Sequence, residues 1–465
     1  MTAVASAASE LRRRLPAERV VDDPDVLSAM SADQSAWSAV GRAAAGVRPR
    51  SSAEVADVVR VCAQLRIPLV PRGAGTGLSG GANALDGCVV LDLSTLDRVL
   101  AVNAGDMTVV VQPGVVNNDL KATLASHGLW YPPDPASAAS STIGGNVATN
   151  AGGLCCVKYG VTRDYVLGLE AVVGGPVDYG TAVRVGRRTA KGVAGYDLVG
   201  LFVGSEGTLG VITEVTLRVR AARGARPRTV VGFFSSLVAA GDAVAKVTAA
   251  GIVPAALELL DRACLQAVED WKHFGLDADA EVLLLAHVDL PGAAGDDEAA
   301  RLVDCFAAAG ATWTAASTDD AEAEALFETR RLVHPAMERR GAVLSEDICV
   351  PRSAVPAMLA AIERIGAAHE LPIATIAHAG DGNLHPLLVT PRGDSAAAAA
   401  AQQAFEEILD AAIELGGTIT GEHGVGLLKR AGLRREQSAD VLAIQHALKA
   451  AFDPLNIFNP GKVLG

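Results

Sequence analysis

Two short stretches of the sequence concentrate residues that could bind a metal ion or move a proton. The first, Ile376–His385, reads IAHAGDGNLH and carries His378 and His385 around a glycine-rich centre. The second reads GEHG and carries Glu422 beside His423. Nine histidines serve the whole chain, and three of them lie in these stretches. Two imidazoles and one carboxylate form a ligand set that leaves coordination positions open for a substrate.

The spacing of His378 and His385 requires a turn between them. A separation of seven residues in one straight strand would place the side chains on opposite faces. Helical spacing would bring them together, but Gly380, Asp381 and Gly382 disfavour a helix. A turn at these three residues lets both imidazoles converge. We therefore expect the histidines to bind a metal together and Asp381 to shape the turn.

Glu422 and His423 are expected to have different tasks. The preceding residues, Thr418–Thr420, are predicted to form a strand, and adjacent residues on an extended chain point apart. Glu422 then joins the two histidines as a metal ligand, and His423 is left as a general base. A metallohydrolase could use the same ligand set to activate water, so that alternative stays open at this point.

The composition describes a large acidic protein. The chain has 465 residues, of which 50% are hydrophobic, so two or three domains are expected. Its net charge of −13 disfavours nucleic acid or anionic membrane as the main partner. No stretch reaches the ~18 apolar residues of a membrane span, and the N-terminus lacks the order of a secretory signal. We expect a cytoplasmic protein, with peripheral association at the inner face of the membrane as an alternative.

The seven cysteines are odd in number and scattered, and no C-x-x-C pair occurs. This pattern is typical of reduced thiols in a cytosol. It disfavours a disulfide frame or an iron–sulfur cluster in this chain.

A glycine-rich loop lies far upstream of the histidines. Residues 71–82 contain five glycines, and they follow a helix predicted over 51–66 and a short strand, Leu69–Val70. Each glycine costs backbone entropy, so such a loop is more typical of a phosphate cradle than of an ordinary flexible loop. The loop matches G-x-G-x-x-G, but it runs into a strand over 87–93. It is therefore not a Rossmann turn, which must open a helix.

Two later segments have a similar character. Residues 140–153 supply many hydrogen-bonding groups and little bulk, which favours a second ligand-facing segment over an ordinary loop. Residues 198–217 contain the sequence GSEGTLG and end in a strand. The alternation of apolar and polar residues over 211–217 predicts that this strand is buried on one face only.

The three segments PRGAGTGLSGGA, IGGNVATNAGG and GSEGTLGVITEVTL, in this order, resemble the FAD-binding domain of vanillyl-alcohol-oxidase-type flavoproteins. More narrowly, almost the whole chain resembles the FAD-linked 2-hydroxyacid dehydrogenases. That branch includes cytochrome-type D-lactate dehydrogenase, the flavin subunit of glycolate oxidase and D-2-hydroxyglutarate dehydrogenase. The resemblance implies an α+β fold. It consists of a two-subdomain FAD-binding domain (1–222), an α+β substrate or cap domain with an antiparallel sheet (223–415) and a C-terminal segment returning to the FAD domain (416–465).

The resemblance also implies where FAD binds. No histidine lies in residues 71–82, so non-covalent FAD is expected. The pyrophosphate would lie on Arg72, Gly73, Ala74, Gly75, Thr76, Gly77, Leu78, Ser79, Gly80 and Ala82. The isoalloxazine and its linker would contact Ser141, Thr142, Gly145, Asn146, Thr149, Asn150 and Gly152. The adenosine side would contact Glu206, Gly207, Gly210 and Ile212, and the further cofactor residues are Pro135, Asn383 and Asn459.

An arginine is implied at the substrate carboxylate. Arg330 matches a family arginine with this task, and a guanidinium fork suits a carboxylate. Arg331 is the neighbouring alternative, in a helix predicted to end near Pro335. Relatives selective for a dicarboxylate carry a lysine in the following strand, where Ser345 and Glu346 offer no cation. This disfavours hydroxyglutarate as the substrate.

The implied reaction oxidises a D-2-hydroxy acid of the D-lactate or glycolate type to the 2-oxo acid by hydride transfer to flavin N5. Zinc or manganese on His378, His385 and Glu422 would position the substrate. His423 would take the hydroxyl proton, and Asn383 would orient substrate or flavin.

Electrons would leave the flavin to a separate acceptor, because neither an iron–sulfur motif nor an NAD site is visible. The acceptor would be a quinone, a cytochrome, an electron-transfer flavoprotein or a sister subunit. The alternatives are the flavin subunit of a multi-subunit glycolate oxidase and D-2-hydroxyglutarate dehydrogenase. A homodimer also stays open.

Overall fold

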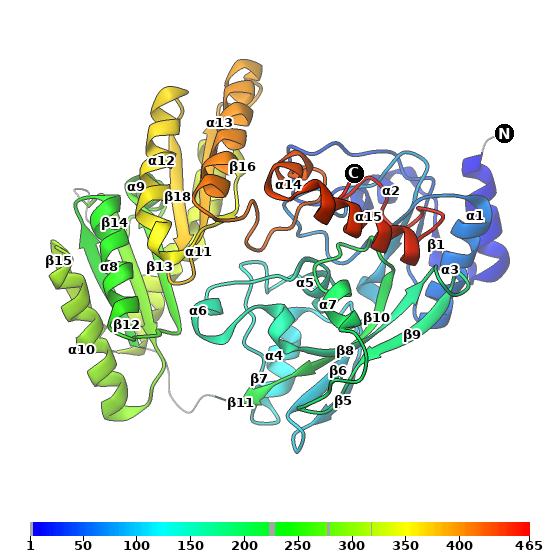
Figure 1. The fold of residues 1–465 in the computed structure, drawn as a ribbon, viewed down its shortest axis with the longest axis horizontal. Helices are drawn as coiled ribbons and strands as arrows, with labels where there is room; N and C mark the ends of the chain where they lie inside the picture. The colour runs from blue at the N-terminus through cyan, green and yellow to red at the C-terminus, as the bar shows by residue number, and fades with distance from the viewer. Residues whose placement is uncertain (1–2, 223–227, 277–279, 318) are drawn as a thin grey trace. The chain divides into compact units, whose positions relative to one another are not determined.

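The computed structural model describes residues 3–222, 228–276, 280–317 and 319–465 (Figure 1). These residues divide into two compact units: the first lies within 1–152, 161–222 and 422–465, and the second lies within 153–160 and 223–421. The boundary predicted after residue 222 adjoins residues 223–227, which lie outside the described residues. The return to the first unit, predicted at residue 416, occurs at Glu422.

Two sheets organise the first unit. The four-stranded sheet has the order β1-β2-β4-β3 and pairs β4 in parallel with β2 and β3. The five-stranded sheet has the order β5-β6-β10-β8-β9 and is antiparallel. The helices are α1 (Ala3–Arg14), α2 (Pro24–Met30), α3 (Ser52–Leu65), α4 (Asn117–Ala125), α5 (Ile143–Thr149), α7 (Leu198–Phe202), α14 (Arg430–Glu436) and α15 (Ala439–Phe452). The strands are β1 (Val20–Val21), β2 (Ala45–Val47), β3 (Leu69–Arg72), β4 (Val89–Asp92), β5 (Val99–Asn103), β6 (Thr108–Val111), β7 (Leu129–Trp130), β8 (Val166–Val173), β9 (Thr181–Gly186), β10 (Val211–Arg218) and β11 (Arg220–Ala221).

The burial of β10 corrects one expectation from the sequence. Val211 packs in the core cluster that contains α3, while Ile212 packs in the cluster that contains α5. The strand is therefore buried on both faces, because it is central in its sheet and helices contact it from two clusters. The predicted ligand-facing segment 140–153 contains the short helix α5, capped by the Thr142 hydroxyl, which accepts from the N–H of Gly145 at 3.3 Å.

One eight-stranded antiparallel sheet organises the second unit, as predicted for the cap domain. Its order is β15-β12-β14-β13-β18-β19-β16, with β17 also paired to β19. The strands are β12 (Arg228–Phe234), β13 (Ala256–Asp261), β14 (Val282–Val288), β15 (Trp313–Ala316), β16 (Ala342–Ser345), β17 (Ile348–Cys349), β18 (Ile373–His378) and β19 (Asn383–Thr390). The helices are α6 (Cys156–Tyr159), α8 (Leu237–Ala249), α9 (Arg262–Lys272), α10 (Gly292–Ala308), α11 (Asp320–Arg340), α12 (Val355–Ala368) and α13 (Ser395–Glu414).

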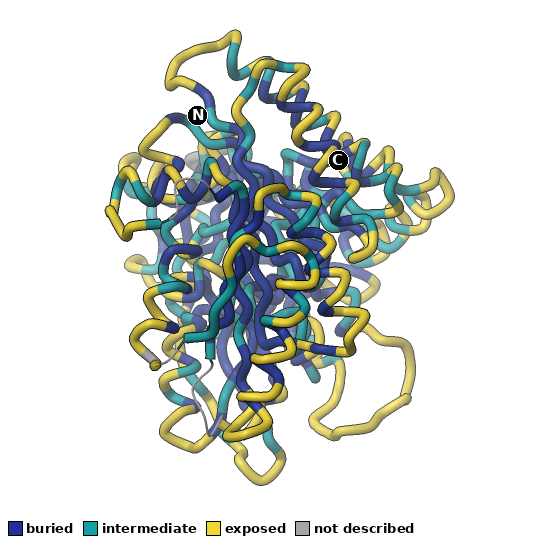
Figure 2. Tube along the Cα trace, turned by 90° about the vertical axis from the view of Figure 1, so that its left-hand side faces the viewer, coloured by how far each residue is buried: buried dark blue, intermediate teal, exposed yellow. Residues whose placement is uncertain are grey.

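Helices cover this sheet in two layers. Helices α9 and α11 contact each other and the sheet, whereas α8, α10, α12 and α13 form a separate layer (Figure 1). The core between the sheet and the α9–α11 layer contains Leu260, Phe327, Ile376 and Leu387. Figure 2 shows long buried stretches of chain between exposed loops. Side chains alternate between the two faces of a strand. Residues of β13, β18 and β19 that lie an even number of positions from these core residues therefore also face α11.

Two local predictions in the second unit were wrong. Helix α11 does not end near Pro335 but continues to Arg340. Proline removes one helical hydrogen bond. The helix continues because Val333 before Pro335, and Ala336 and Met337 after it, are buried in the core. The predicted strand Thr418–Thr420 is a single bridge between Thr418 and Cys349.

Candidate functional site

The turn between the two histidines forms as predicted and joins β18 to β19 in a hairpin. His378 pairs with Asn383, and Ile376 pairs with His385, so the histidines are diagonal neighbours on one face. Their ring centroids lie 5.1 Å apart, with the ring planes at 87°. Both side chains are buried, at 6% and 4% exposure. The hairpin therefore brings the two predicted metal ligands together on the face of the sheet that is covered by α11.

The turn depends on Gly382 and Asp381. Gly382 has φ +90°, and a Cβ there would lie 2.1 Å from the carbonyl oxygen of Val350, so only glycine fits. The Asp381 carboxylate accepts from the N–H of Asn383 at 3.3 Å. These contacts agree with the turn-shaping role that the sequence predicts for Asp381.

Glu258 on β13 connects the β18–β19 hairpin, which carries His378, to helix α11, which carries Arg330. His378 Nδ1 lies 2.8 and 3.0 Å from the two carboxylate oxygens, and Arg330 donates from Nε to Oε2 at 2.8 Å. Glu258 is fully buried. Burial by itself would raise the pKa of this carboxyl, but the charges of His378 and Arg330 hold it below its usual value. The carboxylate is thus ionised and can orient both partners.

Glu258 was not among the site residues predicted from the sequence. A usable signal was present, because this acid interrupts an otherwise apolar run, AALELL, over 255–260. A charged side chain in a buried strand needs a partner, so the position indicates an ion pair. It does not indicate which residues form that pair.

The structure separates the two neighbouring arginines of α11. Arg330 is buried, and no hydrogen-bond partner of its guanidinium other than Glu258 is found among the described residues. The Arg331 side chain is 49% exposed and pairs with Glu324 and Glu328 on its own helix. Arg330 therefore lies on the same side of the sheet as the histidines, while Arg331 faces solvent.

Asp347 is a second buried carboxylate that was not predicted from the sequence. It accepts from Asn383 Nδ2 at 2.7 Å, from Thr420 Oγ1 at 2.7 Å and from the N–H of Gly421 at 3.0 Å. Asn383 also donates to the carbonyl oxygen of Ile348 at 2.8 Å. Both amide hydrogens of Asn383 are thus used within the protein. Asp347 holds the backbone immediately before Glu422.

The fit to a divalent ion can be tested on His378. An imidazole that donates from Nδ1 to a carboxylate carries its lone pair on Nε2, which is the arrangement that metal-binding histidines use. In the Glu258–His378 pair the ionised carboxylate can only accept, so a neutral His378 would donate from Nδ1 and leave Nε2 for a ligand. The second unit therefore fits a divalent metal through His378 and His385. Glu422 and His423 follow directly after Gly421 and belong to the first unit.

In the first unit, the glycine loop closes tightly on its neighbours. Gly75 and Gly80 have φ of +74° and +77°. A Cβ on Gly73 would lie 2.3 Å from Thr142 Oγ1, so the first two predicted FAD segments touch. Arg72 donates to the carbonyl oxygen of Ala32 at 2.5 Å. The other predicted residues of this loop differ in burial. Ala74 is exposed, and Thr76, Gly77 and Leu78 are half-buried.

The second predicted FAD segment contains polar atoms that lack partners. Ser141 Oγ and Asn146 Nδ2 are buried and have no hydrogen-bond partner among the described residues. Buried polar groups are normally paired, so these two atoms fit a bound polar group such as a cofactor. The Thr149 hydroxyl donates to the carbonyl oxygen of Gly145. The side-chain oxygen of Asn150 accepts from the N–H of Arg163. Gly152, two residues after Asn150, is buried, and Pro135 is half-buried.

The third predicted segment holds the C-terminal segment in place. Asn459 Nδ2 donates to the carbonyl oxygens of Gly81 and Glu206 at 2.9 and 2.8 Å. Gly207 lies against Pro71, and a Cβ there would be 3.1 Å from the ring. Gly210 has φ +156° and precedes β10. Ile212 is a core residue of β10.

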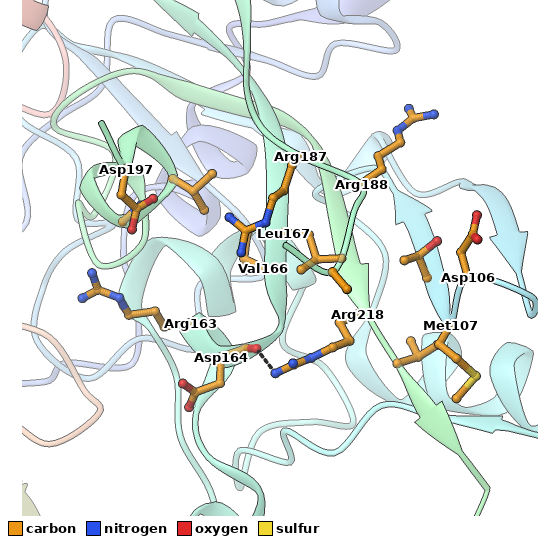
Figure 3. Close-up of a pocket in the computed structure, with 15 residues that line it drawn as sticks. Asp106, Met107, Arg163, Asp164, Val166, Leu167, Arg187, Arg188, Asp197 and Arg218 are labelled. Atoms are coloured by element: carbon orange, nitrogen blue, oxygen red, sulfur yellow. Dashed lines mark hydrogen bonds between the residues drawn. The ribbon is translucent and has the colours of Figure 1, made fainter. Parts of the chain in front are cut away.

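A cavity of about 570 Å³ lies elsewhere in the first unit (Figure 3). Four arginines and three aspartates line it, and Arg218 donates to the backbone carbonyl of Asp164 at 2.6 Å. None of the residues that we predicted for the site lines this cavity. Within the described ranges, no helix combines the length and the apolar character needed to cross a membrane.

Comparison with known proteins places the chain in a family. Residues 43–176 match the FAD binding domain, and residues 225–463 match the C-terminal domain of FAD-linked oxidases. The chain belongs to the FAD-linked oxidase family and is an FAD-linked oxidoreductase, of the glycolate oxidase and D-lactate dehydrogenase type. This confirms the family resemblance seen in the sequence motifs. It also removes the metallohydrolase alternative.

Three curated relatives illustrate the similarity. The chain is 41% identical over 418 residues to the glycolate oxidase subunit GlcD of Bacillus subtilis, covering 90% of this chain and 88% of the relative. It is 38% identical over 420 residues to GlcD of Escherichia coli K12, covering 90% and 82%. It is 34% identical over 421 residues to the probable mitochondrial D-lactate dehydrogenase of Danio rerio, covering 90% and 84%.

Solved structures confirm the predicted vanillyl-alcohol-oxidase-type fold. p-Cresol methylhydroxylase superposes with a TM-score of 0.81 at 17% identity, covering 99% of this chain and 97% of that one. Alkyldihydroxyacetonephosphate synthase superposes with a TM-score of 0.76 at 18% identity, covering 98% and 84%. At these identities the likeness concerns the fold alone.

Proposed function

We propose that the chain oxidises a D-2-hydroxy acid of the glycolate or D-lactate type to the 2-oxo acid, with FAD as the immediate electron acceptor. The observation that carries this proposal is the Glu258 carboxylate, which binds both His378 and Arg330 on one buried face. A 2-hydroxy acid presents a hydroxyl and a carboxylate on neighbouring carbons. A metal-binding histidine and an arginine held by one carboxylate match that pair of groups.

Arg330 is the proposed receptor for the substrate carboxylate. Its Nε is bound to Glu258, which orients the guanidinium and leaves the two terminal nitrogens to form a bidentate pair. The buried position of Arg330 strengthens such a pair, because water screens it little. Arg331, which is exposed and paired on its own helix, is not assigned a role.

His378, His385 and Glu422 are the proposed ligands of a divalent metal, zinc or manganese. When bound, such an ion supplies Lewis acidity that lowers the pKa of the substrate hydroxyl. Two observations support the assignment: the hairpin places the two imidazoles together, and Asp347 anchors Gly421, the residue before Glu422. Asp347 and Glu258 are then the carboxylates that orient the ligands.

His423 is the proposed general base. It takes the proton of the substrate hydroxyl while the Cα hydrogen leaves as a hydride, so one proton and one hydride are removed from the acid. FAD, when bound, supplies N5 as the hydride acceptor. Non-covalent FAD would be held by the glycine loop 71–82 and by Ser141 and Asn146, whose unpaired polar atoms support a bound ligand there.

A monocarboxylate substrate is preferred over hydroxyglutarate. A second substrate carboxylate would need a second cation, and the strand β16 ends with Ser345 followed by Glu346. Glu346 is a fully buried acid, with Oε1 accepting from the N–H of Asp347 at 2.7 Å. This position therefore supplies no cation for a further carboxylate.

The test is a stopped-flow screen of flavin bleaching at about 450 nm, the usual absorbance of bound flavin. Wild-type protein, with its flavin and metal content measured, is mixed with the D and L forms of lactate, with glycolate and with D-2-hydroxyglutarate. We expect rapid bleaching with glycolate or D-lactate. The variant His423→Ala should bleach on the order of 10²- to 10⁴-fold more slowly. Normal bleaching in that variant would remove the base assignment, and a colourless protein would remove the whole proposal.

A second candidate is a flavin subunit that works only within a larger complex. It is supported by the GlcD relatives, which are named as subunits of glycolate oxidase. In either case a bound flavin would need a separate electron acceptor, which is a quinone, a cytochrome, an electron-transfer flavoprotein or a sister subunit. Assay of the purified chain with glycolate, D-lactate and a dye acceptor separates the two candidates, because an obligate subunit would show no turnover alone.

A further inference from the structure

Glu206 is a buried acid that ties two distant parts of the first unit together. It lies in the GSEG turn between α7 and β10, with φ +50° and 8% exposure. Its Oε1 accepts from the N–H of Val425 at 2.7 Å, and its Oε2 accepts from the N–H of Gly426 at 2.9 Å. Both carboxylate oxygens are thus bound to the backbone that follows His423.

Ser79 holds the same segment from the glycine loop. Its hydroxyl donates to the carbonyl oxygen of His423 at 3.2 Å. Its own carbonyl oxygen accepts from the N–H groups of Leu427 and Leu428 at 2.8 and 3.1 Å. The segment 423–428 is therefore bonded at both ends to Ser79 and in its middle to Glu206.

Two glycines make this close approach feasible. Gly424 has φ +85°, and a Cβ there would lie 2.8 Å from Glu206 Oε1. Gly426 has φ +50°, and a Cβ there would lie 2.2 Å from the carbonyl oxygen of Ser79. The sequence EHGVG thus places glycine at both points where a side chain would push the segment away from Ser79 and Glu206.

A buried lysine accompanies this carboxylate. Lys462 Nζ donates to the carbonyl oxygens of Gly81 and Asn83 at 3.1 and 2.7 Å. Its charge opposes the effect of burial on Glu206. The glycine loop, Glu206 and the C-terminal segment therefore form one bonded network, which positions the backbone of His423 relative to the predicted FAD loop.

We propose that Glu206 is a positioning residue for His423, acting with Ser79 as a clamp on residues 423–426. This rests on the proposed function, in which His423 takes the substrate proton. A general base must lie within hydrogen-bond reach of that proton, so a displacement of its backbone lowers the rate without removing the base. The clamp also links the loop that holds FAD to the segment that carries the base.

The test is the variant Glu206→Gln, prepared as the FAD-loaded holoenzyme. Glutamine keeps the size but replaces one acceptor oxygen with an NH₂ donor, which would face a backbone N–H. We expect kcat to fall about 10- to 100-fold with KM and flavin content unchanged. Hydrogen exchange at the amides of Val425 and Gly426 should become faster, while the flavin absorbance spectrum stays that of the wild type.

Glu214→Gln is the matched control. Glu214 lies on β10, and its carboxylate is 3.5 Å from Arg184 at the surface. The same chemical change at this position should leave kcat, KM and amide exchange at Val425 and Gly426 unaltered. Ser79→Ala is a second test, which removes one hydrogen bond to His423 and should lower kcat about 2- to 10-fold.

Three results would overturn the clamp. They are a wild-type kcat in the flavin-loaded Glu206→Gln variant, unchanged exchange at residues 425 and 426, and loss of flavin with full recovery of the rate on adding FAD. The last result would assign Glu206 to the cofactor instead. Failure of the proposed function is distinguishable, because wild-type protein would then oxidise no 2-hydroxy acid while the exchange measurement would still report on the clamp.

Discussion

Two glutamates, one in each unit, are both buried but differ in what they bind. Glu258 is shared by His378 and Arg330, and their charges hold its pKa below the usual value. Among the described residues, Glu206 accepts hydrogen bonds only from the backbone N–H groups of Val425 and Gly426, and burial raises its pKa to about 7. Burial is the largest influence on both carboxyls. The partners decide the outcome, because the hydrogen-bonded charges of His378 and Arg330 offset the cost of desolvation, whereas two backbone N–H groups and the opposing charges of Lys462 and Asp33 do not.

The largest expected effect comes from Glu258→Gln. Glutamine leaves the Arg330 charge buried without a counter-ion, so the free energy of unfolding should fall by about 3–5 kcal/mol. Metal affinity should fall about 10- to 100-fold, because His378 loses the carboxylate that orients it. Chemical denaturation and metal titration of the purified variant measure the two effects. Unchanged metal affinity together with lower stability would show that Glu258 serves Arg330 alone.

The pH dependence of stability should reveal the raised pKa of Glu206. Between its ordinary value of 4.5 and about 7, the folded protein holds a proton that the unfolded chain releases. The contribution of this group to stability is therefore present below pH 4.5 and is lost as the pH rises to 7. The loss is on the order of 3 kcal/mol.

The comparison of wild type with Glu206→Gln isolates this effect. Asp33 and Lys462 are retained in the variant, but Glu206 also raises the pKa of Lys462, so the wild-type and variant curves are compared below pH 7. Chemical denaturation from pH 4.5 to 7 should show a decline in the wild type that is absent from the variant. Parallel curves would mean that the carboxylate is already ionised at pH 4.5.

Asp347→Asn should have an intermediate effect. Asp347 accepts from the Gly421 N–H and from Thr420, so its loss would release the backbone that leads to Glu422. We expect metal affinity to fall about 10-fold, the lower end of the range for groups that orient ligands. Metal titration checks this. An affinity equal to that of the wild type would remove Glu422, or the anchoring by Asp347, from the proposed site.

Arg331→Gln should have the smallest effect. This arginine is 49% exposed, and its pairs with Glu324 and Glu328 lie at the surface. Exposed pairs contribute about 0–1 kcal/mol, so stability, KM and kcat should all stay close to the wild type. Arg330→Gln provides the contrast, with a raised KM for the 2-hydroxy acid. A raised KM in the Arg331 variant would exchange the roles of the two arginines.

The local features of the site followed from the sequence. Glycine spacing predicted the tight loop at 71–82, and Gly380–Gly382 predicted the turn that brings His378 and His385 together. These features depend on a few adjacent residues, whose backbone preferences are set by the residues themselves. The order of the three glycine-rich segments likewise indicated the family, which the comparisons confirm.

The partners of the buried carboxylates could be found only in the folded chain. Glu258 is separated from His378 by 120 residues, and Glu206 is separated from Val425 by 219 residues. No local pattern encodes such pairs, since they depend on strand order and on how the C-terminal segment returns. The histidines, the turn between them and the glycine-rich loops could be read from the order of residues, because short-range geometry dictates them. The tertiary structure decided which acid is paired with charge and which with backbone, because only packing brings those groups within hydrogen-bond distance.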